Sequence, residues 1–350
     1  MSKLNNKFVI LTAFYNCEDY IARNVIGTLK QGTNDLGVIF INDGSQDDSE
    51  EILFDQITGS FGGNIQQSGS SNVWTGEAFG KDILYVKHEQ NSGCAGLNQK
   101  VAVDRYVSNT DTICGIVDGD DFLNDNGAVA WVTEKMGSDK LLYASTQRWK
   151  RAEGGSKDCY YLSNKLLTQA DFPDFVVGGV TFSGHKCLPL RSQTFRLNHF
   201  RAFRKILSDN VETGRSFVNP TGGLMKAGSD VAFFKPMIDM AEPDRIEISR
   251  ACHYSYTYDS PLNDHNLYHD DQHRNAKFCH YSIKNVDFVS GSTGHVAQWC
   301  LDRGVSYGHV SGNDVNLSGV VDGKTGYFFW NKYPETGSVT CSTPYNRINW

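Results

Sequence analysis

The first third of the chain alternates between short apolar runs and segments whose apolar residues recur at helical spacing. Each apolar run stops at polar or glycine residues, as buried strands do. This alternation predicts a mostly parallel sheet flanked by helices, with ligands bound at the carboxyl edge of its strands. Strands are predicted at residues 7–14, 37–41, 82–86 and 113–117. Three helices are predicted: one at 18–31, a second that begins at 47, and a third that ends at 107.

The pattern is less regular in the rest of the chain. Residues 61–80, rich in Gly, Ser and Asn, are predicted to be an inserted loop. Phe195–Leu207 is predicted to be a basic amphipathic helix, and Ser229–Met240 a helix with Asp230 near its N-cap. Short strands are expected at 141–144, 176–182, 246–249 and 252–258. From Leu262 the periodicity disappears, and the end of the chain is predicted to be a small β-appendage.

Composition narrows the class of protein. The chain of 350 residues is 39% hydrophobic and 21% charged, and its net charge of -7 gives no overall attraction to nucleic acid or anionic membranes. No run is long and apolar enough for a transmembrane segment, and the first residues lack the apolar core of a signal peptide, so a cytoplasmic protein is expected. The nine cysteines form no CxxC pair and are expected to be reduced.

Three carboxylates follow the apolar run at Ile113–Val117. Asp118, Asp120 and Asp121 would lie together at a strand tip and repel one another at neutral pH. A divalent cation between them would remove that repulsion, and hard oxygen ligands without a neighbouring His favour Mg²⁺ or Mn²⁺. The alternative is a solvated Asp-rich turn.

Four sequence blocks, in this order along the chain, resemble glycosyltransferase family 2, the inverting enzymes of the GT-A fold. They are Thr12–Asn16, Asn42–Asp47, Gln90–Gly93 with Asn98, and Asp118–Asp121. The resemblance covers about residues 7 to 125 and implies a Rossmann-like α/β fold with an acceptor-side α+β half and a C-terminal appendage. It further implies a nucleotide-diphosphate sugar as donor, expected to be a UDP-sugar, and Mn²⁺ or Mg²⁺ as cofactor.

The resemblance also implies roles for individual residues. Thr12, Phe14 and Tyr15 would contact the nucleobase, and Asp43 would accept hydrogen bonds from the base or ribose. Asp118 would face the ribose and the metal, Asp120 would bind the metal, and Asp121 would hold the loop. The remaining implied donor-site residues are Gly44, Asn91, Gly93, Cys94, Asn98 and Gly119.

A general base and a further metal ligand are expected in the second half of the chain. Asp230 lies where the resembled family places its base, and an ordinary helix N-cap is the alternative. His265 is the candidate metal ligand. His265, His269 and His273 are spaced four residues apart, so they would share one face of a helix; a solvated or structural role is the alternative. The family's Arg before Asn98 is missing, so Lys100 or a basic residue of the second half would have to contact phosphate.

Together these features predict three parts. Residues 1–145 would bind the nucleotide sugar, 146–265 would form the acceptor and catalytic half, and 266–350 the appendage. The expected acceptor is a glycan or another soluble hydroxyl compound. The alternatives are modified DNA, as in a phage-type DNA glycosyltransferase with a basic groove around Arg148 to Arg151, a nucleotidyltransferase, and a non-catalytic sugar-binding module. The sequence does not indicate the oligomeric state.

Overall fold

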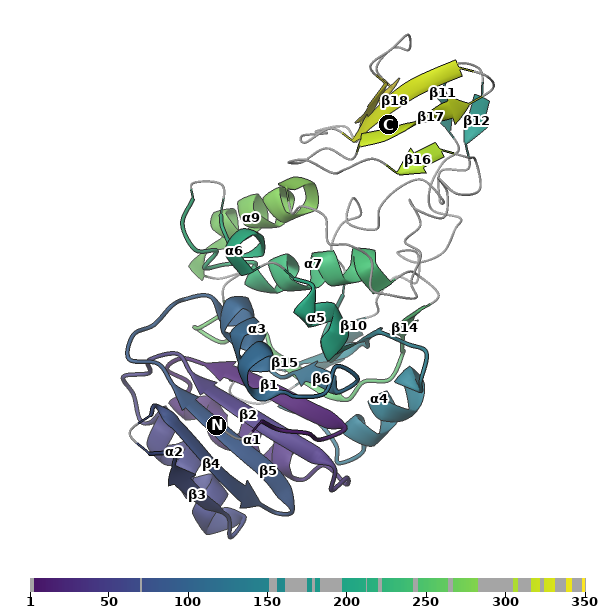
Figure 1. Ribbon diagram of the computed structural model, residues 1–350. Helices are drawn as coiled ribbons and strands as arrows, with labels where there is room; N and C mark the ends of the chain where they lie inside the picture. Colours follow the sequence, from purple (N-terminus) through teal and green to yellow (C-terminus); the bar gives the residue numbers. More distant parts are fainter. Residues whose placement is uncertain are drawn as a thin grey trace.

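The predicted apolar runs form the centre of a nine-stranded sheet in the computed structural model (Figure 1). Four neighbouring strands are parallel and run in the order β6-β1-β2-β5. They are β1 (Phe8–Phe14), β2 (Leu36–Asn42), β5 (Lys81–Lys87) and β6 (Ile113–Ile116). The structure describes residues 3–69, 71–150, 156–160, 175–177, 180–182, 197–211, 213–219, 222–241, 245–263, 267–282, 305–307, 316–321, 324–330, 338–341 and 348–349.

A hairpin extends this sheet on one side where a loop was predicted. β3 (Asn64–Gln67) pairs with β4 (Val73–Ala78), and β4 pairs antiparallel with β5. The prediction of a loop at 61–80 is therefore wrong. The Ser- and Asn-rich part of this stretch is only the turn, while Trp74 on β4 packs against Tyr85, with ring centroids 5.1 Å apart. This aromatic contact stabilises two strands that the polar composition of the stretch did not predict.

On the other side, β13 (Arg201–Arg204) lies antiparallel between β6 and β8 (Leu142–Ala144), and β14 (Ile246–Ile248) completes the sheet. The prediction of a helix at Phe195–Leu207 is wrong for the residues described here, since the helix α5 (Lys205–Asp209) follows the strand. Ala202 and Phe203 are fully buried between two strands, so pairing and burial override the helical spacing. β13 and β4 run against the other strands of the sheet.

Helices cover both faces of the sheet. One apolar core lies under α1, α2 and α4, and a second lies under α3, α5 and α7 (Figure 1). The helix α9 packs on α7, which in turn packs on α3. The bounds are α1 (Glu18–Leu29), α2 (Ser49–Asp55) continuing as a π-helical turn (Gln56–Ser60), α3 (Ala95–Tyr106), α4 (Ala128–Met136), α6 (Thr213–Ser216), α7 (Ser229–Ala241) and α9 (His269–Ser282).

The remaining strands form smaller sheets. A four-stranded sheet has the order β10-β9-β15-β7, with β7 (Phe122–Leu123), β9 (Gln147–Lys150), β10 (Ser156–Tyr160) and β15 (Tyr254–Thr257). β11 (Phe175–Val177) pairs with β12 (Val180–Phe182). A five-stranded antiparallel sheet contains β16 (Val305–Tyr307), β17 (Asn316–Val321), β18 (Lys324–Trp330), β19 (Ser338–Cys341) and β20 (Ile348–Asn349).

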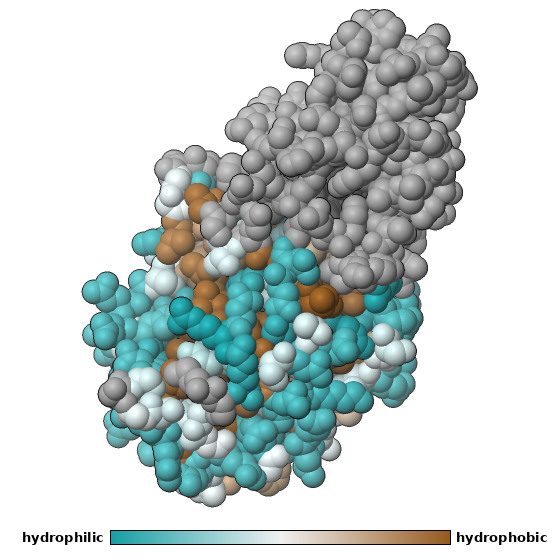
Figure 2. Space-filling view, in the orientation of Figure 1, coloured by the Kyte–Doolittle hydropathy of each residue, from teal (hydrophilic) through white to brown (hydrophobic). Residues whose placement is uncertain are grey.

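The second half of the chain contributes to the first sheet. β13 and β14 come from the expected acceptor half and extend the sheet of the donor half, so the division at residue 145 stays a prediction. Within the described part, no helix has the length and apolar character needed to cross a membrane. On the face drawn in Figure 2, hydrophilic side chains cover most of the surface around the large sheet.

Candidate active site

The acidic residues lie in a loop directly after β6, at the carboxyl edge of the parallel strands. The loop stays attached to β1, because the Val117 N–H donates to the Leu11 carbonyl over 3.0 Å and the Gly119 N–H donates to Ala13 over 3.2 Å. A Cβ atom on Gly119 would lie 2.4 Å from the Cβ of Phe14. Only glycine therefore fits at this position.

Replacing Gly119 by alanine is expected to destabilise the fold by about 1–3 kcal/mol, since the added methyl group must displace β1 or the loop. Gly59→Ala is the matched control: no atom lies within 4 Å of a Cβ built there, and Gly59 has no positive φ. Urea denaturation of both variants measures the difference. Equal stability of the two variants would contradict the close contact.

Residues of β15 hold the loop from the other side. The Tyr254 hydroxyl donates to Asp121 Oδ2 over 2.8 Å and accepts from the Asp118 N–H over 3.1 Å. The Thr257 N–H donates to Asp121 Oδ1 over 2.7 Å. Burial, together with the nearby Asp120 and Asp118, raises the pKa of Asp121 well above its ordinary value. Asp121 thus holds the loop, as the sequence suggested, while each of its oxygens keeps a second lone pair.

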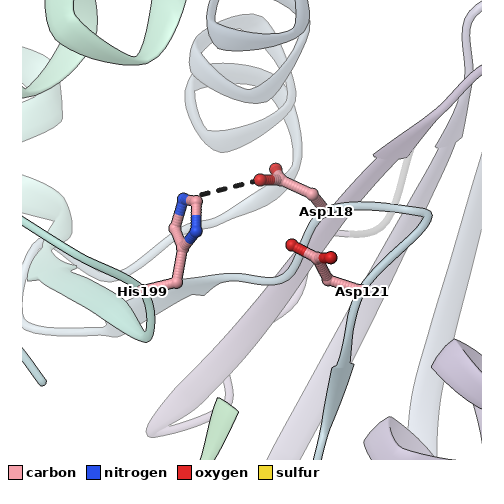
Figure 3. A group of neighbouring side chains, drawn as sticks. All are labelled: Asp118, Asp121 and His199. Carbon is pink, nitrogen blue, oxygen red and sulfur yellow. Dashed lines mark ion pairs between the residues drawn. The ribbon is translucent and has the colours of Figure 1, made fainter. Parts of the chain in front are cut away.

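Asp118, Asp121 and His199 bring potential metal-ligand atoms together (Figure 3). One ligand atom from each residue lies within 4.8 Å of the others, and His199 Nε2 is 3.5 Å from Asp118 Oδ2. His199 immediately precedes β13, which lies beside β6, so strand pairing brings it to the acidic loop. Sequence reasoning missed His199, since it lies inside the segment that was predicted to be a helix.

The environment of this group is one that could hold a divalent cation. The pKa of Asp118 is raised to about 7, mainly by burial; Arg201 and a hydrogen bond from Gln99 lower it, while the charges of Asp120 and Asp230 contribute to the increase. Burial also lowers the pKa of His199 well below its ordinary value. The imidazole is therefore neutral, and among the described residues neither of its buried ring nitrogens has a hydrogen-bond partner. A neutral imidazole beside two carboxylates fits a divalent cation.

Asp120, another expected metal ligand, is placed differently. The carboxylate of Asp120 is hydrogen-bonded to Ser260, and its pKa is raised mainly by burial. The Asp120 carbonyl accepts from Thr257 Oγ1 over 2.7 Å. Asp120 does not belong to the group of Asp118, Asp121 and His199. His265 lies outside the described residues, and α9 begins at His269.

Asp43 organises the neighbouring loop. Its Oδ1 accepts from the Ser92 N–H over 3.0 Å and lies 3.0 Å from His88 Nδ1, and its Oδ2 accepts from Ser92 Oγ over 3.0 Å and from the Gly93 N–H over 3.1 Å. Burial alone would raise the pKa of Asp43, but these hydrogen bonds outweigh burial and lower it. The four contacts use about the full capacity of a carboxylate. A bond to a base or ribose would therefore share or replace one of them.

The first loop offers one open aromatic side chain. Thr12 is fully buried and Phe14 is 3% exposed within the core under α1, whereas Tyr15 is 36% exposed. A nucleobase contact by the side chain of Phe14 would require it to leave that core. Tyr15 is therefore the aromatic side chain of this loop that a planar ligand can reach.

The remaining predicted donor residues Gly44, Asn91, Gly93, Cys94 and Asn98 lie in or next to the loop between β5 and α3. Gly44 has a φ of +78°, and a Cβ there would lie 2.8 Å from Asn91 N, so the two loops touch. Asn91 Oδ1 accepts from the Gly93 N–H over 2.6 Å, and Cys94 is fully buried. Asn98 Oδ1 accepts from Ser92 Oγ over 3.2 Å.

Lys100 does not replace the missing Arg as a phosphate contact. Its side chain is 3% exposed and its Nζ contacts both oxygens of Asp104, over 2.6 and 2.5 Å. This i, i+4 pair lies within α3, and Lys100 is buried there.

Asp230 lies in the first turn of α7. Arg201 Nη1 donates to Asp230 Oδ2 over 2.9 Å, and the Val231 N–H donates to Oδ1 over 2.7 Å. The Asp230 side chain is 43% exposed, and its charge contributes to the raised pKa of Asp118. An open carboxylate thus lies within electrostatic reach of the proposed cation ligands.

The sequence profile of Glycosyl transferase family 2 matches residues 9–207, which is more than half of the chain. The chain belongs to glycosyl transferase family 2. The expected family, the enzyme class and the GT-A type of α/β fold are thereby confirmed. The nucleotidyltransferase and non-catalytic alternatives are not favoured by membership of glycosyl transferase family 2.

Individual proteins resemble the chain only in part. The teichoic acid poly(glycerol phosphate) polymerase of Staphylococcus epidermidis is 28% identical over 90 residues, which are 26% of this chain and 10% of that protein. The crystal structure of S. aureus TarS 1-349 has a TM-score of 0.45 and 16% identity, covering 71% of this chain and 60% of that one. Glucosyl-3-phosphoglycerate synthase from Mycobacterium tuberculosis has a TM-score of 0.38 and 15% sequence identity, and the match covers 73% of each chain.

Proposed function

We propose that the protein transfers a sugar, with inversion, from a nucleoside diphosphate donor to an acceptor hydroxyl. The group of Asp118, Asp121 and His199 carries this proposal, because two carboxylates meet a neutral imidazole that has no hydrogen-bond partner among the described residues, at the carboxyl edge of the parallel strands. Ligands bind at that edge in open α/β sheets. Asp43 and the open ring of Tyr15 lie at the ends of the neighbouring strands β2 and β1.

The residues have separable roles in the proposed reaction. Tyr15 would stack on the nucleobase, Asp118 would face the ribose and the cation, and Asp230 would take the proton of the acceptor hydroxyl. A divalent cation would supply positive charge for the departing diphosphate. Asp121 would keep the loop in place through Tyr254 and Thr257. Asp120 and His265 remain predicted ligands from the sequence.

The imidazole of His199 changes the preference between the two expected metals. Mg²⁺ favours oxygen ligands and octahedral geometry, whereas Mn²⁺ also accepts a nitrogen ligand. We therefore expect activity to be lost in chelator and restored better by Mn²⁺ than by Mg²⁺. Steady-state rates in metal titrations after chelation measure this. Unchanged activity in chelator would exclude a metal role.

His199→Gln is expected to raise the Mn²⁺ concentration for half-maximal activity by about 10–100-fold, since one ligand is lost. His269→Gln is the matched control: His269 is 55% exposed on α9, and its replacement is expected to leave the metal titration unchanged. A titration curve for His199→Gln that overlays that of the unmodified protein would remove His199 from the site.

The donor and acceptor can be identified with the purified protein. UDP-sugars are the first donors to test, followed by other nucleotide sugars, each with Mn²⁺. Release of nucleoside diphosphate without acceptor identifies the donor, and its increase with a glycan or another soluble hydroxyl compound identifies the acceptor. No release and no binding with any donor would overturn the proposed function. The comparisons do not support modified DNA as the acceptor.

A further inference from the structure

Arg201 is a buried cation between the two parts of the candidate site. It lies on β13 opposite Ile116, two residues before Asp118. Its side chain is 3% exposed. A guanidinium group keeps its charge even when buried, so Arg201 places a permanent positive charge among the carboxylates.

Arg201 fixes Asp230 through two contacts with one helix. Its Nη1 donates to Asp230 Oδ2 over 2.9 Å. Its guanidinium carbon lies 5.0 Å from the ring centroid of Phe234, one turn further along α7. The planar group is therefore held by both a charged hydrogen bond and a ring face. The second oxygen of Asp230 accepts the Val231 N–H, so the carboxylate has one defined orientation.

The same charge acts on the metal side of the site. Arg201 pairs on β13 with Ile116 at the end of β6, from which the chain continues directly into the acidic loop. Without Arg201, the Asp230 carboxylate would lose the guanidinium that binds it, and its negative charge would no longer be offset. Repulsion would then favour displacement of Asp230.

We propose that Arg201 is a positioning residue for sugar transfer: it orients the Asp230 carboxylate toward the acceptor and offsets the repulsion between Asp230 and the cation ligands. This inference rests on the proposed function, because it needs Asp230 to act on the acceptor hydroxyl. Arg201 itself touches neither substrate in this scheme. Its effect on transfer passes through Asp230.

Arg201→Met tests the proposal. We expect kcat for transfer to fall by about 10²-fold, which is the cost of a misplacement of about 1 Å at a reacting group, while the donor KM changes little. Arg201→Lys should recover part of kcat, since it keeps the charge but not the planar fork. A loss of stability alone would also lower the apparent kcat at an unchanged KM, so each kcat is divided by the folded fraction of the same sample, measured by urea denaturation. A loss of kcat that disappears after this correction would overturn the proposal. Arg204→Met is the matched control, because Arg204 lies at the other end of β13 and binds carbonyls of Lys140 and Asp111.

A double-mutant cycle separates this inference from the proposed function. If Arg201 acts through Asp230, Arg201→Met should cause no further loss of transfer in the Asp230→Asn background. A further loss of the same size would show that Arg201 acts independently, which would overturn the inference and leave the proposed function standing. Absence of transfer by the unmodified protein with every donor would overturn the proposed function and this inference with it.

Discussion

Asp118→Asn is expected to lower transfer by about 10³-fold, because it removes both a cation ligand and the charge that the cation must neutralise. Asn keeps nearly the same shape, so the hydrogen bond from the Asp118 N–H to Tyr254 can remain. Steady-state kinetics at saturating Mn²⁺ and donor measure the loss. Asp111→Asn is the matched control, since Asp111 is exposed just before the other end of β6. Loss below about tenfold would contradict a central role for Asp118.

The pH dependence of cation binding gives an independent test of Asp118. Burial raises its pKa to about 7, so below that pH the carboxyl is protonated and a cation must displace the proton. The affinity for Mn²⁺ should therefore weaken as pH falls from 8 to 6, and Asp118→Asn should remove part of this dependence. Calorimetric titration with Mn²⁺ at several pH values measures both effects. A pH dependence that is identical in the variant would contradict the assignment.

Asp230→Asn is expected to lower transfer by about 10²- to 10⁴-fold, the usual contribution of a general base. The amide cannot accept a proton from the acceptor hydroxyl, yet it can still accept a hydrogen bond from Arg201. Donor binding should be retained, because the donor-side loops around Asp43 and Tyr15 do not contain Asp230. Transfer kinetics and donor binding on the same sample measure the two effects.

Two outcomes would remove Asp230 from this role. Unchanged transfer by Asp230→Asn would eliminate it as the base and support the N-cap alternative. Equal loss of donor binding and transfer would indicate a structural effect. Asp209→Asn is a suitable control, because Asp209 forms an i, i+4 pair with Lys205 on α5. This variant removes a paired carboxylate on α5, which covers the same face of the sheet as α7. We expect it to transfer sugar normally.

The parallel part of the fold is readable from the sequence because each central strand is a continuous apolar run. Strands β1, β2, β5 and β6 are buried on both faces, so burial and sequence pattern coincide. β13 is different: Arg201 and Arg204 lie at the ends of a four-residue strand whose apolar pair also suits a helix. Only its pairing with β6 and β8 decides the outcome, and pairing between distant segments leaves no local signal.

The same limit applies to the candidate site. The motif of Asp118, Asp120 and Asp121 is local, so the acidic loop was predictable. The choice of Asp121 rather than Asp120 beside Asp118 depends on where Ser260, Thr257 and Tyr254 direct the side chains. His199 is brought in by the misassigned strand. Its isolated position in the sequence gives no ligand spacing that would have identified it.

The Tyr254 and Thr257 contacts to Asp121 also have a consequence for biosynthesis. These partners follow Asp121 by 133 and 136 positions in the chain. At typical translation speeds, the acidic loop leaves the ribosome on the order of ten seconds before them. During that interval the parallel strands before it can already pair and hold the loop on β1, but the Asp121 side chain lacks its Tyr254 and Thr257 partners. A nascent chain released before Tyr254 is therefore expected to hold much of the sheet without a competent cation site.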